Sequence, residues 1–165
     1  MLLRIFCLLS LLPLAACSGS PTENRAKPGG VLAALANPDR VELIALHPYP
    51  HQIKEDEQMD RMHGYGVLGR AVMSDDASAN TLLAGIEIGI IEASDGLTVD
   101  CFNPRHGLRA TVGQTLWELV ICYECRSMQV YRDGEHVDGH TTVERTGIEV
   151  TAVFEAAGLT IHTNE

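Results

Sequence analysis

Four short runs of apolar and β-branched residues in the second half of the chain constrain its fold more than any other feature. Pairs of residues that favour tight turns follow three of the runs, at Asn103-Pro104, Gly113-Gln114 and Asp133-Gly134. Strands joined by such short connections pair with their neighbours in antiparallel fashion. We therefore predict an antiparallel meander built from residues 97–102, 107–112, 115–122 and 128–132.

The third run shows the alternation expected of a half-buried strand. Trp117, Leu119, Ile121 and Tyr123 fall on one face, and Glu118 interrupts the other. This pattern predicts that the first face packs into the core and that the second is only partly buried.

Two helices and two earlier strands complete the predicted architecture. Asp75, Asp76 or Ser78 can cap a helix that runs to about residue 92. Gly85 and Gly89 on that helix indicate close packing against a neighbouring element. The sequence thus predicts a small single α+β domain over residues 31–165, with an antiparallel β meander and two main helices; the remaining elements are strands at 41–46 and 66–73 and a final helix at 143–157.

The N-terminus has the three parts of an export signal. Arg4 precedes an apolar run over residues 5–14, which is too short to span a membrane as a helix. Leu14-Ala15-Ala16-Cys17 then resembles the lipobox of bacterial lipoproteins. The resemblance implies that residues 1–16 are a signal peptide and that Cys17 carries the lipid of the mature protein.

Residues 17–30 are rich in Ser, Pro and Gly and read as a flexible tether after the lipidated cysteine. Ser18 follows Cys17 where a signal for retention in the inner membrane usually carries Asp. By resemblance to lipoproteins of bacteria with two membranes, this favours the outer membrane, facing the periplasm. The lipid would anchor the protein to the membrane.

The charge balance excludes some partners. The formal net charge is −10 at pH 7, so the chain has no basic footprint for nucleic acid. The same charge would keep the domain from anionic lipid surfaces. The partners that we expect are the membrane, through the lipid, and a protein of the cell envelope.

Three cysteines and one histidine form the most informative cluster. Cys101 and His106 bracket one predicted turn, and Cys122 and Cys125 bracket another. Two short loops that each present two such ligands are typical of a tetrahedral structural zinc site. This interpretation makes Cys101, His106, Cys122 and Cys125 the ligands of one Zn²⁺.

Three other interpretations of the cluster stay open. Export to an oxidising compartment favours a disulfide between Cys122 and Cys125. The same C-x-x-C pair could be redox-active, or Cys101 could be a nucleophile with His106 as its base. Finally, the cysteines could be buried as small apolar side chains.

Other polar groups give weaker signals. Arg105 and Arg109 flank His106 and could bind an anion together, although pairing with carboxylates is the commoner role. His47 and His51 surround a Pro-Tyr-Pro segment, and His136 and His140 fall in a segment that reads as a turn. Either histidine pair could contact a metal.

A resemblance of the domain itself rests on three segments: His63 to Gly69, Cys101 to Arg109 and Ile121 to Cys125. Together they resemble a group of uncharacterised bacterial exported proteins, over about residues 41–160. This resemblance implies no reaction, ligand or cofactor.

The sequence therefore predicts a membrane-anchored envelope lipoprotein with a structural or ligand-binding domain, organised by the Cys/His cluster. The alternative is a thiol-disulfide oxidoreductase that uses Cys122 and Cys125. A structural role is favoured over an enzymatic one, because the sequence contains no other recognised catalytic motif.

Overall fold

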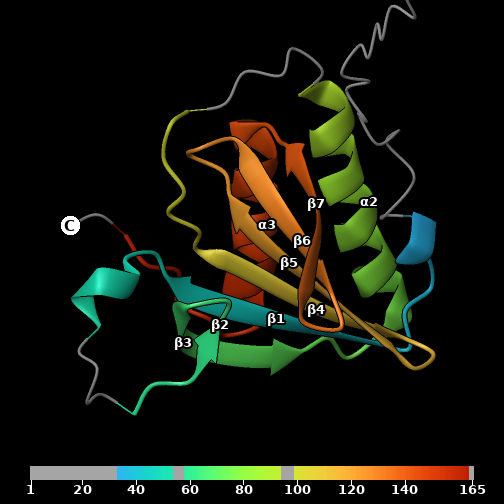
Figure 1. Cartoon of the computed structure of the whole chain (residues 1–165). Helices are drawn as coiled ribbons and strands as arrows, with labels where there is room; N and C mark the ends of the chain where they lie inside the picture. The colour runs from blue at the N-terminus through green and yellow to red at the C-terminus, as the bar shows by residue number, and fades with distance from the viewer. Residues whose placement is uncertain (1–32, 54–57, 94–98, 164–165) are drawn as a thin grey trace, which may run out of the picture.

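The computed structural model describes residues 33–53, 58–93 and 99–163, which fold around one antiparallel sheet (Figure 1). In this part of the chain the sheet has seven strands in the order β2-β3-β1-β4-β5-β6-β7. β1 pairs with both β3 and β4, so it lies inside the sheet, and the meander β4–β7 extends the sheet on one side. The strands are β1 (Arg40–His47), β2 (Arg61–Met62), β3 (Tyr65–Val72), β4 (His106–Val112), β5 (Thr115–Cys122), β6 (Ser127–Arg132) and β7 (Glu135–Thr141).

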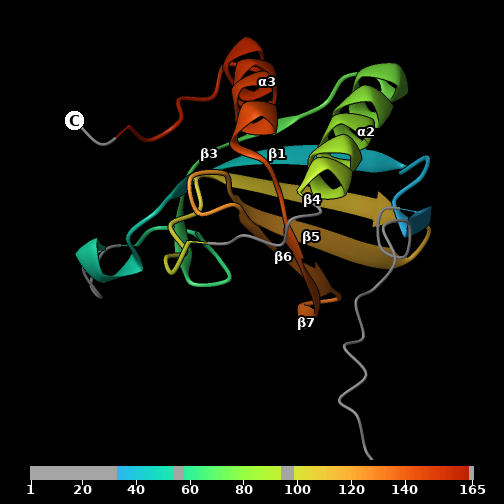
Figure 2. The ribbon, with the colours of Figure 1, turned by 90° about the horizontal axis from the view of Figure 1, so that it is seen from above.

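Two α-helices cover the same face of this sheet (Figure 2). α2 (Asp76–Glu92) connects β3 to β4, and α3 (Glu144–Ala156) follows β7. A short 3-10 helix, η1 (Pro50–Gln52), follows β1. The main core lies between helices and sheet and buries, among others, Leu43, Ile86, Leu108, Leu119 and Phe154. The predicted α+β class, with a β meander and two main helices, is confirmed.

The local signals of α2 act as predicted. The Asp75 side chain accepts a hydrogen bond from the Ser78 N–H at 2.8 Å and caps the helix. Gly89 lies against α3, because a Cβ at this position would come within 2.9 Å of the hydroxyls of Thr142 and Thr146. Gly85 has open space beside it, so only Gly89 reflects close packing.

Two predictions about the meander need correction. The run at 97–102 forms no strand in its described part, residues 99–102. Its backbone instead docks on the turn after β5, where the Val99 N–H donates to the Cys125 carbonyl at 3.2 Å. Conversely, His136 and His140 lie in strand β7 and not in a turn. β7 is the edge strand, and its mostly exposed, polar side chains lack the apolar alternation of a core strand.

The second face of the sheet, opposite the helices, is more buried than predicted. Glu118 is 5% exposed and Val120 is fully buried. Met62 of the β2–β3 hairpin packs with Val120 there, and Phe102 joins them from the loop before β4. These segments cover a face that the sequence of β5 alone suggested would be partly open.

The predicted signal peptide, Cys17 and the tether lie outside the described residues. Those predictions therefore stay predictions. Among the helices that the structure describes, none is long and apolar enough to cross a membrane.

Candidate functional site

The turn between β5 and β6 holds two of the predicted site residues. Cys122 ends β5, and residues 123–126 form the turn. Arg126 closes the turn with φ = 53°, a left-handed conformation. A disulfide bond joins Cys122 to Cys125, and both residues are at most 1% exposed. The predicted disulfide pair is therefore the pairing found in this structure.

Cys101 reaches the same disulfide from the loop that precedes β4. Its Sγ lies 2.6 Å from the Sγ of Cys125, and among the described cysteines it is the free one. The backbone N–H of Asn103 points to the same Cys125 sulfur at 3.4 Å. The sulfur of Cys125 thus lies beside two others, and the exposed Cys101 is the one that solvent can reach. We call Cys101, Cys122 and Cys125 the sulfur cluster.

His106, the fourth predicted zinc ligand, is directed away from the sulfur cluster. Its Nε2 forms a 2.9 Å hydrogen bond with the Thr151 hydroxyl of α3, and its ring packs edge-to-face on Tyr123 and Phe154. Tyr123 faces the helices, so the alternation of β5 places Cys122 on the opposite face. The four predicted ligands do not converge, and no three His, Cys, Asp or Glu side chains in the described segments are arranged to hold a metal ion.

Burial controls the protonation of His106. Desolvation, with a contribution from the positive charge of Arg105, lowers its pKa from 6.5 to about 4. The imidazole is consequently neutral at pH 7. The neutral ring can form its hydrogen bond with the Thr151 hydroxyl, and it brings no charge into the core.

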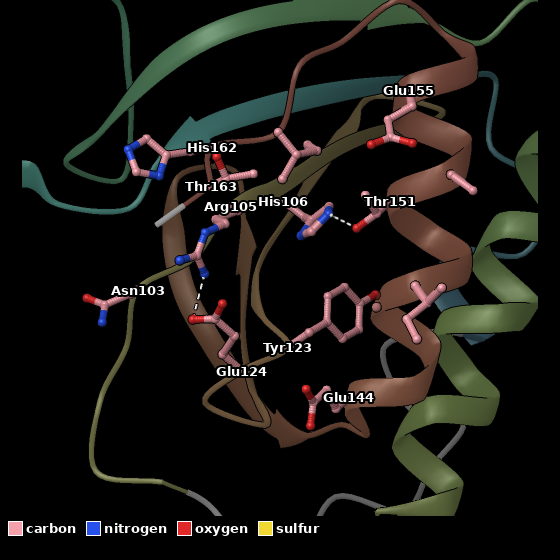
Figure 3. A pocket seen from close by; sticks show the side chains of 14 residues that line it. Asn103, Arg105, His106, Tyr123, Glu124, Glu144, Thr151, Glu155, His162 and Thr163 are labelled. Carbon is pink, nitrogen blue, oxygen red and sulfur yellow. Dashed lines mark hydrogen bonds and ion pairs between the residues drawn. The ribbon is translucent and has the colours of Figure 1, made fainter. Parts of the chain in front are cut away.

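A cavity of about 560 Å³ opens beside His106 (Figure 3). It lies between α3, the beginning of β4, the β5–β6 turn and the segment that follows α3. Arg105 lines it and forms a 2.8 Å ion pair with Glu124, which comes from the turn between the two bonded cysteines. Gly147 lets α3 approach this site, because a Cβ there would lie 2.6 Å from the Tyr123 side chain.

Two buried polar atoms on the cavity lining have no hydrogen-bond partner within the described residues. They are the Tyr123 hydroxyl and Nδ1 of His162. Burial raises the pKa of Tyr123 well above its ordinary value, so the phenol stays protonated. Burial and the nearby charges of His47 and Arg105 lower the pKa of His162, which favours its neutral form. Unpartnered buried polar atoms are uncommon, so they mark this cavity as a place where a ligand or water could bind.

The second face of the sheet carries a charged network that sequence reasoning missed. Glu118 accepts two hydrogen bonds from Arg109, at 2.9 and 2.8 Å, and its other oxygen lies 2.8 Å from Nε2 of His63. The His63 ring stacks on Tyr131 with their centroids 3.4 Å apart. Arg109 also lies 3.5 Å from Glu42 on β1. Arg109 and Glu118 are paired across the β4–β5 hairpin, whereas Glu42 on β1 and His63 in the β2–β3 turn are far from them in sequence and are brought close only by the sheet.

The remaining predicted pairs do not assemble into sites. Arg105 and Arg109 do not share an anion site: each takes the commoner role of pairing with a carboxylate, Arg105 with Glu124 and Arg109 with Glu118 on the other face. His47 contacts His162 instead of forming a site with His51, with the ring centroids 4.8 Å apart. His140 lies 3.4 Å from Asp138, and His136 contacts Tyr131.

No family model, curated protein or solved structure matches the chain. The fold and site by themselves define an α+β domain with a sulfur cluster on one side of the β5–β6 turn and a partly polar cavity on the other.

Proposed function

We propose that this protein is a lipid-anchored protein of the cell envelope that carries out thiol-disulfide exchange through its sulfur cluster. The observation that carries the proposal is the 2.6 Å separation between the free Sγ of Cys101 and the disulfide-bonded Sγ of Cys125. The lipobox resemblance supports an exported location, where disulfides form and persist.

The first step is an exchange within the cluster. The Cys101 thiolate attacks the Cys125 sulfur, a Cys101–Cys125 bond forms, and Cys122 leaves as a thiolate. One disulfide replaces another, so the step needs no external oxidant or reductant. The free thiol is positioned against its target, which favours this intramolecular reaction over attack by a thiol in solution.

The exchange would move the disulfide to the exposed Cys101, where a partner thiol can reach it. In the Cys122–Cys125 form, both bonded sulfurs belong to buried residues, whereas Cys101 is exposed. In the Cys101–Cys125 form, a thiolate of a partner dithiol can attack Cys101, and Cys125 leaves as a thiolate. The second partner thiolate then attacks its own bonded sulfur and releases Cys101. The partner gains a disulfide and the cluster gains two thiols, so the electrons balance; the reverse reaction reduces a partner disulfide.

The proposal can be tested by mapping the disulfides of the full chain with Cys17→Ser, exported and quenched with acid. Trypsin should place Cys101 in peptide 71–105 and the other two cysteines together in peptide 110–126. We expect a fraction of the wild type to contain these two peptides joined by a disulfide. Cys122→Ser should convert almost all of the protein to the joined form, because Cys125 then has only Cys101 as a partner.

Reduction kinetics give a second readout with a matched control. With glutathione in excess, we expect Cys101→Ser to slow reduction of the cluster by about tenfold or more, because the relay from the surface is lost. The double variant C101S/D100C keeps an exposed thiol one residue away and should stay slow. Equal rates in wild type and Cys101→Ser would contradict the proposal. So would a native mass that shows one bound zinc and three reduced cysteines.

A further inference from the structure

We propose that the cavity beside α3 binds a small amphipathic monocarboxylate, with the carboxylate on Arg105 and the apolar body against α3. This site lies on the helix side of the β5–β6 turn and does not depend on the thiol chemistry. Three features of the cavity point to this ligand class (Figure 3).

The first feature is the buried guanidinium of Arg105, whose carboxylate partner a ligand carboxylate can replace. Arg105 is only 8% exposed, although the protein as a whole is acidic. The side chain of its partner Glu124 is 55% exposed, so this carboxylate can turn toward solvent at little cost. A ligand carboxylate in its place would form the same charge-assisted ion pair with the guanidinium. The buried charge would stay paired throughout, which avoids the penalty of an isolated ion.

The second feature is the apolar wall of the cavity. Ile148 on α3 is 73% exposed, the largest exposure among the large hydrophobic side chains that the structure describes. Ala152, one turn along the helix, and Ile161 in the segment after α3 also line the cavity. A volume of about 560 Å³ lies within the range of small-molecule sites. An apolar ligand body would therefore bury Ile148 and gain hydrophobic stabilisation.

The third feature is the polarity of the rest of the lining. Nδ1 of His162 is buried without a hydrogen-bond partner in the described chain, and His162 is near enough to Arg105 to be affected by its charge. A neutral His162 can donate to the carboxylate oxygen that Arg105 leaves free. Glu144 and Glu155 also line the cavity, and their negative charges would oppose a ligand with a second anionic group. The site therefore selects one carboxylate and not a polyanion.

Isothermal titration of the full chain with Cys17→Ser can test this site with two matched probes, 3-phenylpropionate and 3-phenylpropanamide. We expect saturable binding of the acid with one molecule per chain, and binding of the amide weaker by about tenfold or more, because the amide lacks the charge-assisted contact. Equal affinity for acid and amide, or no saturable binding of the acid, would overturn the proposal.

Variants of the ion pair give opposite expected effects. Arg105→Gln should weaken binding of the acid by about tenfold or more, whereas Glu124→Gln should strengthen it several-fold, because the competing carboxylate is gone. Arg145→Gln removes an exposed α3 arginine that pairs with Glu92, and it should leave the affinity unchanged. If Arg105→Gln does not fold, the Glu124→Gln result decides: weaker or unchanged binding would overturn the proposal.

Discussion

The buried neutral state of His106 predicts a specific loss of stability in mild acid. The pKa of this imidazole is about 4 in the fold and about 6.5 when unfolded. Between these values the unfolded chain binds a proton that the folded chain does not. The free energy of unfolding therefore falls as the pH drops below about 6.5, and the loss is complete near pH 4. The full shift is worth about 3 kcal/mol, of which about 2 kcal/mol is lost between pH 7 and pH 5.

His106→Gln is the perturbation that isolates this effect. Glutamine keeps a neutral polar group that can reach the Thr151 hydroxyl, but it cannot titrate. Urea unfolding of both proteins at pH 7 and pH 5, followed by far-ultraviolet circular dichroism, gives the change in stability for each. We expect the change for wild type to exceed that for His106→Gln by about 2 kcal/mol.

The exposed His51 provides the matched control. His51→Gln should retain the wild-type dependence on pH, because it removes a histidine without removing the buried one. Equal changes in stability for wild type and His106→Gln would refute the reasoning, since His106 would then titrate alike in the folded and unfolded chains.

Three further substitutions test helix packing and the charged network on the second face of the sheet. Gly147→Ala should destabilise the fold by about 1–3 kcal/mol, because its Cβ would meet the Tyr123 side chain at 2.6 Å. Gly85→Ala on α2 should instead stabilise the fold by up to about 1 kcal/mol, because no atom lies within 4 Å of the added Cβ and alanine favours the helix. Thermal unfolding of the two variants should shift in opposite directions, and equal shifts would refute the packing argument. Glu118→Ala should cost about 1–3 kcal/mol in urea unfolding, because it removes the buried carboxylate that Arg109 and His63 share; a cost below about 1 kcal/mol would show that the network contributes little.

Local signals in the sequence were sufficient to predict the elements whose formation depends on residues close together in the chain. The helix cap at Asp75 and the turn at Gly113 each act within a few residues, so α2 and the β4–β5 hairpin follow from sequence. The position of β1 between β3 and β4 depends on pairing across long distances in sequence. No short-range pattern contains that information, and β7 was missed because its edge position leaves it without a buried apolar face.

The candidate site was also predicted only where its residues are close together in sequence. The spacing placed Cys122 and Cys125 close together, because they are three positions apart in the chain, and the expected export favoured a disulfide between them. Spacing failed for His106, because a single step along a strand reverses the face to which a side chain points. The loop before β4 carries Cys101 to one face of the sheet, while His106 at the start of β4 faces the helices. Of the network around Glu118, only Arg109 lies across the predicted hairpin; Glu42 and His63 join it from β1 and the β2–β3 turn, which no short-range pattern places beside Glu118.

The sulfur cluster and the cavity are connected through the same two chain segments. The loop before β4 contains both Cys101 and Arg105, and the β5–β6 turn contains Cys125 and Glu124. A change from the Cys122–Cys125 bond to a Cys101–Cys125 bond would link the loop before β4 covalently to the β5–β6 turn. The new bond would lie close to the Arg105–Glu124 ion pair, which a ligand carboxylate has to displace. If both proposals hold, we expect the disulfide state to alter ligand affinity, although binding itself does not require the thiols. By thermodynamic linkage, the ligand must then alter the disulfide equilibrium by the same factor.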